Sequence, residues 1–152
     1  MYPQLLAASA RKAGVNKIVA AAFTGETDPA LAQHVDLIEW MRVGQLGRLL
    51  KFFRDQKVHH AIMAGQIAPK NLFDLHPDWK ALLLLGRLKQ RNAESIFAAI
   101  ADELTKVDVD LLAATTFLED SLAQTGLIAG PKPSRREEDD VEFGWKIAKE
   151  IA

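Results

Sequence analysis

The sequence contains no cysteine in its 152 residues. This absence excludes disulfides, thiolate metal sites and cysteine nucleophiles, and it is typical of proteins from a reducing compartment. The sequence also has no run of about 18 apolar residues, the length that a membrane-spanning helix needs. Its first residues lack the basic start and long apolar stretch of a signal peptide. We therefore expect a cytoplasmic protein.

An excess of charge of one sign is missing as well. Nineteen basic and twenty acidic residues give a formal net charge of -1, so no overall field attracts nucleic acid or an anionic membrane. The basic and aromatic surface of an RNA-binding protein does not occur, and we expect no nucleic-acid partner. The Walker loop, the zincin motif and the nucleophile elbow are also absent.

What the sequence does contain is an alternation of strand and helix patterns. Four apolar segments with β-branched residues predict strands at 17–23, 35–40, 61–65 and 109–117. Amphipathic spacing predicts helices at 3–12, 44–57 and 78–89, and another that begins after Asn92. This alternation predicts an α/β fold, a Rossmann-like open parallel sheet with flanking helices. A helix opens at residue 3 before any strand, so the usual first strand is expected to be missing.

The chain is expected to divide near residue 130. Residues 1–130 are predicted to form the α/β domain, and residues 131–152 a linker and a terminal helix. Ser134 and Glu137 have the spacing of a capping box at the start of that helix. The helix places Val141, Trp145 and Ile151 on one face, which predicts that it continues into, or docks on, a further part.

Candidate ligand-binding residues follow from the expected sheet. Ligands of open parallel sheets bind beyond the carboxyl ends of the strands. Gly65 would let a ligand approach the backbone, Gln66 can donate and accept hydrogen bonds, Lys70 can meet a phosphate, and Thr116 follows the last predicted strand. The alternative is that Gly65 only makes a turn, which such loops need in any case.

No metal site is predicted within this chain. His59 and His60 are adjacent, so they would point to opposite faces of a strand. His34 and His76 stand near turns and are expected at the surface. From the residues alone, the sequence therefore predicts a ligand-binding α/β domain without a visible catalytic centre.

Four segments carry a resemblance to a known family. The segments are MYPQLLA, IMAGQIAPKNLFDLHPD, AATTFLED with GLIAGPKPS, and VEFGWKIAKEIA. In this order and spacing they resemble the N-terminal half of the two-domain UDP-2,3-diacylglucosamine pyrophosphatase of lipid A biosynthesis. This family is unrelated to the calcineurin-like phosphoesterases. The resemblance spans nearly the whole chain.

The resemblance implies a reaction and a place for this chain in it. Family members hydrolyse UDP-2,3-diacylglucosamine to 2,3-diacylglucosamine 1-phosphate (lipid X) and UMP. The reaction uses Mg²⁺ and acidic residues of the C-terminal domain, which is missing here, so no catalytic residue can be carried over and no cofactor is expected in this chain alone. A strand and a glycine-rich loop would precede Tyr2. Gly65, Gln66, Lys70 and Thr116 become candidates for one wall of the substrate cleft.

Other interpretations stay open at this point. The chain could be a non-catalytic module that binds a nucleotide or a partner protein. A dehydrogenase-like dinucleotide domain is disfavoured because its glycine fingerprint is absent. A homo-oligomer is compatible with the sequence. The leucine run at 82–85 could contribute an apolar surface for peripheral contact with the inner membrane.

Overall fold

The computed structural model of the chain describes residues 1–66, 77–88 and 92–151. The chain falls into two compact units, Met1–Asp120 and Ser121–Ala152. Lys70 and residue 89, at which a predicted helix ends, lie outside the described residues. The boundary near residue 130 stays a prediction.

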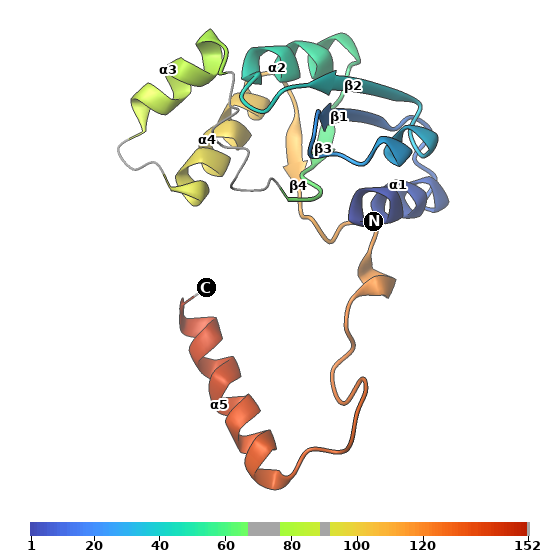
Figure 1. Cartoon of the computed structure of the whole chain (residues 1–152), viewed down its shortest axis with the longest axis vertical. Helices are drawn as coiled ribbons and strands as arrows, with labels where there is room; N and C mark the ends of the chain where they lie inside the picture. Colours follow the sequence, from blue (N-terminus) through green and yellow to red (C-terminus); the bar gives the residue numbers. More distant parts are fainter. Residues whose placement is uncertain (67–76, 89–91, 152) are drawn as a thin grey trace. The chain divides into compact units, whose positions relative to one another are not determined.

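The first unit is an α/β domain with parallel strands. Strand β1 (Val19–Phe23) pairs in parallel with β2 (Leu37–Met41), and β3 (His60–Ile62) pairs in parallel with β4 (Asp110–Leu112) (Figure 1). Helices alternate with the strands along the chain, as βαβ units require. The predicted α/β class with parallel strands is confirmed. The strands form two small sheets of two strands each.

Two predicted strands extended too far at their carboxyl ends. The segment 61–65 was expected to be extended throughout, but β3 ends at Ile62. The segment 109–117 was also expected to be a strand, but β4 ends at Leu112 and a turn follows. Apolar residues show that a segment can be a strand, whereas the length of a strand depends on how far a neighbour continues the hydrogen-bond ladder. Within the described residues, β3 and β4 have only each other as partners.

The α-helices of the first unit begin within two residues of the predicted starts, whereas the 3-10 helices η1 and η3 were not predicted. The first unit contains α1 (Tyr2–Lys12), η1 (Pro29–Gln33), α2 (Leu46–Asp55), α3 (Trp79–Arg87) and α4 (Ala93–Thr105), and η3 (Glu119–Ser121) spans the boundary between the two units. The Asp78 side chain caps α3 by accepting from the Ala81 N–H, and Asn92 caps α4 by accepting from the Ser95 N–H, both at 2.9 Å. Both predicted caps are confirmed.

A hydrophobic core joins α2, α3 and α4 to the start of β4. Its buried members are Leu46, Leu50, Ala81, Leu84, Leu104 and Val109. The leucine run of α3 divides between two environments, because four consecutive helical residues cannot share one face. Leu84 is buried in this core, while Leu82 and Leu83 are 49% and 42% exposed.

A carboxylate ties α1 to the first sheet. Asp36 Oδ2 accepts from the Ile18 N–H and from Arg11 Nη2, each at 2.7 Å. These two donors, the Ile18 N–H first and the guanidinium second, hold the pKa of Asp36 below its usual value. Arg11 also donates to the Asn16 carbonyl at 2.7 Å. The Arg11–Asp36 ion pair therefore connects α1 to the residues that precede β1 and β2.

This tie predicts an acid-dependent loss of stability. A carboxyl whose folded pKa is depressed stabilises the fold above its unfolded pKa, roughly 3.9 for aspartate, and the contribution disappears as pH falls through the folded pKa. We expect Asp36→Asn to lower the midpoint of urea unfolding at pH 7 and to lower it less at pH 2.5, because part of the Asp36 contribution is lost below its unfolded pKa. If the unfolding midpoints of the variant and the parent chain differ by the same amount at both pH values, this role is contradicted.

The second unit contains the terminal helix α5 (Arg135–Ile151). The predicted capping box is confirmed: the Ser134 N–H donates to Glu137 Oε2 at 2.7 Å, and the Glu137 N–H donates to Ser134 Oγ at 3.4 Å. No residue of α5 is buried. Among the helices of the described part, none combines the length and the apolar character needed to cross a membrane.

Candidate functional site

The first turn of α1 contacts the loops that follow β3 and β4. The Tyr2 hydroxyl donates to the carbonyl of Ala114, two residues beyond the end of β4. Pro3 lies against Gly65, which follows β3, because a Cβ added to Gly65 would come 3.8 Å from Pro3 Cγ. The carboxyl ends of β3 and β4 therefore meet at one edge, next to the amino end of α1.

The same turn of α1 also contacts the loop that follows β1. Gln4 Nε2 donates to Asp28 Oδ2 at 2.8 Å, and Asp28 caps η1 through the Ala30 N–H. Three consecutive side chains thus contact three strand-end loops. These contacts bring together parts of the chain that are more than a hundred residues apart in the sequence. We call this region the strand-end site, defined by Tyr2, Pro3 and Gln4 and the loops they contact.

Three of the four predicted site residues lie in or next to these loops. Gly65 has φ +106°, which side chains rarely adopt, so glycine is needed there for the backbone itself. Gln66 follows it and is exposed. Thr116 lies in the turn after β4, where its N–H donates to the Ala113 carbonyl at 3.0 Å. Lys70 lies outside the described residues.

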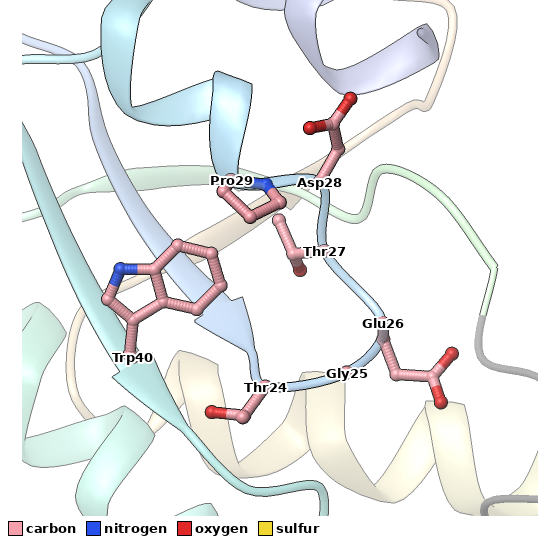
Figure 2. A pocket seen from close by; sticks show the side chains of 7 residues that line it. All are labelled: Thr24, Gly25, Glu26, Thr27, Asp28, Pro29 and Trp40. Atoms are coloured by element: carbon pink, nitrogen blue, oxygen red, sulfur yellow. The ribbon is translucent and has the colours of Figure 1, made fainter.

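A hollow at the carboxyl end of β1 was not among the predicted site residues. It has a volume of about 640 Å³ and is lined by residues 24–29 and Trp40 (Figure 2). The rule that ligands bind beyond the carboxyl ends of parallel strands applies to Thr24 and Gly25, which follow β1. It missed Trp40, because a single tryptophan inside a strand pattern looks like a core residue. We call this hollow the Trp40 pocket.

The loop of the Trp40 pocket is held by its own hydrogen bonds. The Thr24 N–H donates to the Met41 carbonyl at 2.9 Å, which joins the loop to β2. The Phe23 N–H donates to Thr27 Oγ1 at 3.0 Å, and the Thr27 N–H donates back to the Phe23 carbonyl at 2.9 Å. These hydrogen bonds connect the loop to itself and to β2.

The charge of this loop is negative. The Ala30 N–H, and after it the Gln4 side chain, lower the pKa of Asp28, so this carboxyl is ionised at neutral pH. Among the described residues that line the pocket, none is basic.

A comparison with protein-family models shows which family this chain resembles. The model described as the LpxI N-terminal domain matches residues 1–121. The chain belongs to the LpxI N-terminal domain family. LpxI is a UDP-2,3-diacylglucosamine pyrophosphatase, and membership supports a role in lipid A biosynthesis. A search of curated proteins found no match.

The LpxI N-terminal domain match includes both sheets and the whole strand-end site. It runs from α1 to η3, so it contains the loops that bear Gly65, Gln66 and Thr116 as well as the Trp40 pocket. Helix α5 lies beyond the matched residues. The family assignment therefore applies to the first unit, where the candidate site is located.

The described part of this LpxI N-terminal domain contains no cluster of side chains that could bind a metal ion. In residues 1–66, 77–88 and 92–151, no three histidine or acidic side chains gather in a way that could hold one. Asp28 already accepts from Gln4 and from the Ala30 N–H. These residues do not fit a magnesium site, so we assign no metal-dependent step to them.

Proposed function

We propose that this chain forms one wall of the substrate cleft of a UDP-2,3-diacylglucosamine pyrophosphatase. The complete enzyme would hydrolyse its substrate to lipid X and UMP, and the chain alone would be inactive. The observation that carries the proposal is the strand-end site, where the first turn of α1 contacts the loops after β1, β3 and β4. Ligands of open parallel sheets bind at this edge.

The chemistry of the edge suits a pyrophosphate at its centre. The amino end of α1 lies between the loops, and α1 has no side-chain cap. Amino ends of helices favour anions because their backbone N–H groups are unpaired and the helix dipole is positive there. Gly65 has no side chain to keep a phosphate from the backbone, and Gln66 can donate to phosphate oxygens. Lys70 would add a positive charge if its loop turns to this edge.

The attacking water and its activation are assigned to a second domain. Hydrolysis of a pyrophosphate needs charge neutralisation on the phosphoryl oxygens, which magnesium commonly supplies. Because the described residues do not fit a magnesium site, we propose that acidic residues of a C-terminal domain hold it. This chain would then bind and orient the substrate, and that domain would complete the centre.

The substrate carries two acyl chains, which suggests contact with the cytoplasmic face of the inner membrane. Leu82 and Leu83 of α3 are exposed, and Trp79 at the start of that helix is 73% exposed. Exposed apolar side chains of this kind can enter a lipid interface. We propose that α3 supplies this contact, and Leu82→Ser with Leu83→Ser should then reduce co-sedimentation with lipid vesicles.

The loop after β3 gives the sharpest test of the binding proposal. We expect Gln66→Ala and Lys70→Ala to weaken the affinity for UDP-2,3-diacylglucosamine by about fivefold or more each, since each removes one hydrogen bond to a charged group. The melting temperature should hardly change. Calorimetric titration measures the affinity, and Gln33→Ala, another exposed glutamine, serves as the control.

The opposite pattern would count against this assignment. If both variants bind as tightly as the parent chain but melt several degrees lower, the loop is structural. If the parent chain binds UMP but not the acylated substrate, the alternative of a non-catalytic nucleotide-binding module becomes the better account.

A further inference from the structure

We propose that β1 and β3 together bind one extended apolar segment of another polypeptide, which adds a parallel strand between them. In the part of the chain that the structure describes, β1 pairs only with β2, and β3 pairs only with β4. One edge of β1 and one edge of β3 therefore carry no strand. The proposal goes beyond the proposed function, because it concerns a polypeptide partner and not the substrate.

Backbone hydrogen bonds identify the residues on the unpaired edge of β1. Along a strand, the backbone groups of alternate residues point to opposite edges. The Thr24 N–H donates to the Met41 carbonyl at 2.9 Å, so the even-numbered residues at this strand direct their backbone groups to β2. Val19 and Ala21 therefore direct theirs to the other edge.

The same reasoning identifies the unpaired edge of β3. The Asp110 N–H donates to the His59 carbonyl at 2.8 Å, so the odd-numbered residues direct their backbone groups to β4. His60 and Ile62 face away from β4. We call the two sets of backbone groups the open edges: Val19 and Ala21 of β1, and His60 and Ile62 of β3.

Contacts at both ends of the strands connect β1 to β3. At the carboxyl ends, the first turn of α1 contacts the loop after β1 through Gln4 and the loop after β3 through Pro3. At the amino ends, Lys17 Nζ donates to Gln56 Oε1 at 3.1 Å, which joins the start of β1 to the end of α2. Figure 1 shows β1 and β3 between β2 and β4. The open edges therefore face each other.

The composition of β1 is that of an interior strand. Exposed edges of natural sheets usually carry charged residues or proline, which prevent pairing with other chains. Strand β2 follows this rule through Glu39, which pairs with Arg48 at 2.6 Å. Strand β1 has the sequence VAAAF, with no charge and no proline.

These features define the partner that fits. Unpaired backbone groups on a sheet edge bind extended peptides by adding them as a strand. A strand with neighbours on both sides needs apolar side chains on both faces and free N–H groups, so it contains no proline. We therefore commit to an extended apolar segment that runs parallel to β1 and β3.

Amide hydrogen exchange followed by NMR tests the open edges in the free chain. We expect the open-edge amides to have protection factors about tenfold or more below those of Ala20 and Ala22, whose backbone groups face β2. Equal protection would show that the edges are already paired and would overturn the proposal. Protection that rises with protein concentration would show that a second copy occupies the edges instead.

The probe for binding is the acetylated and amidated peptide KIVAAAF, which has the sequence of residues 17–23. We expect it to slow exchange at the open edges by about tenfold or more and to leave Ala20 and Ala22 unchanged. The same peptide with proline in place of its central alanine should have no effect. No slowing by KIVAAAF, or equal slowing by both peptides, would overturn the proposal.

A spin label tests the direction of the added strand. In a parallel arrangement, a nitroxide at the carboxyl end of the peptide should broaden the Gln4 amide signal, and one at the amino end should broaden that of Lys17. The reverse pattern would contradict the parallel arrangement.

Ala21→Pro tests the same edge from within the chain. Its N–H faces away from β2, so proline should leave the chain folded and weaken peptide binding by about tenfold or more. Ala20→Pro is the matched control, because it interrupts the pairing with β2 and should lower the melting temperature. Unchanged peptide binding in folded Ala21→Pro would overturn the proposal. If Ala21→Pro does not fold, the exchange measurements on the parent chain decide.

Discussion

Turnover of UDP-2,3-diacylglucosamine is expected only when this chain is combined with the second domain of an LpxI enzyme. The chain alone, with magnesium, should release no UMP above the uncatalysed background. Adding a separately produced C-terminal domain should raise the rate by several orders of magnitude, because positioning and metal-assisted charge neutralisation act only when both walls of the cleft are present. Release of UMP, followed by chromatography, measures the rate.

The controls for this experiment come from the strand-end site. The second domain alone should be inactive, which shows that the chain contributes more than a scaffold. Gly65→Val in this chain should abolish the restored activity, because valine is strained at φ +106° and its side chain would lie against Pro3 in the strand-end site. If a well-folded pair binds substrate but releases no UMP, the assignment to this enzyme is contradicted.

The largest loss of stability that follows from the described contacts is expected for Asp78→Ala. Asp78 caps two helices at once: its Oδ1 accepts from the Ala81 N–H of α3 at 2.9 Å, and its Oδ2 accepts from the Gly47 N–H of α2 at 2.6 Å. Alanine would leave both half-buried donors without this partner. Losing one cap costs about 1 kcal/mol, and an unsatisfied donor costs about 1–3 kcal/mol, so we expect a total of about 2–4 kcal/mol.

Asn92→Ala is the matched control for this variant. Asn92 caps only α4, through one bond to the Ser95 N–H, so its loss should cost about 1 kcal/mol. Urea unfolding of both variants gives the comparison. Equal losses would mean that the contact between Asp78 and Gly47 contributes nothing. Gly47→Ala tests the same contact from the other side, because its Cβ would lie 3.0 Å from Asp78 Oδ2.

Local signals predicted the helix starts, but the sequence could not predict the lengths of the strands. Asp78, Asn92 and the pair Ser134 and Glu137 all cap where their spacing indicates, because a cap is made within one turn of its own chain. Strands depend on a neighbour far away in the sequence. That is why 109–117 looked like a long strand although β4 ends at Leu112.

The candidate site shows the same division between local and distant information. Gly65 could be found because an apolar segment followed by glycine indicates a turn at a strand end. Trp40 and Gln4 could not be found in this way. Their importance comes from Pro29 on the far side of the loop and from Asp28, 24 residues after Gln4, which only the folded chain brings next to them.

The most direct test of the account is to map where UDP-2,3-diacylglucosamine binds on this chain. Backbone amide chemical shifts can be followed by NMR during a titration with the substrate. We expect the largest shifts at Tyr2, Gln4, Gly65, Gln66 and Thr116, and only small shifts in α5. Saturable binding with its largest shifts in α4 or α5, or no saturable binding at all, would contradict the claim that the strand-end site is a wall of the substrate cleft.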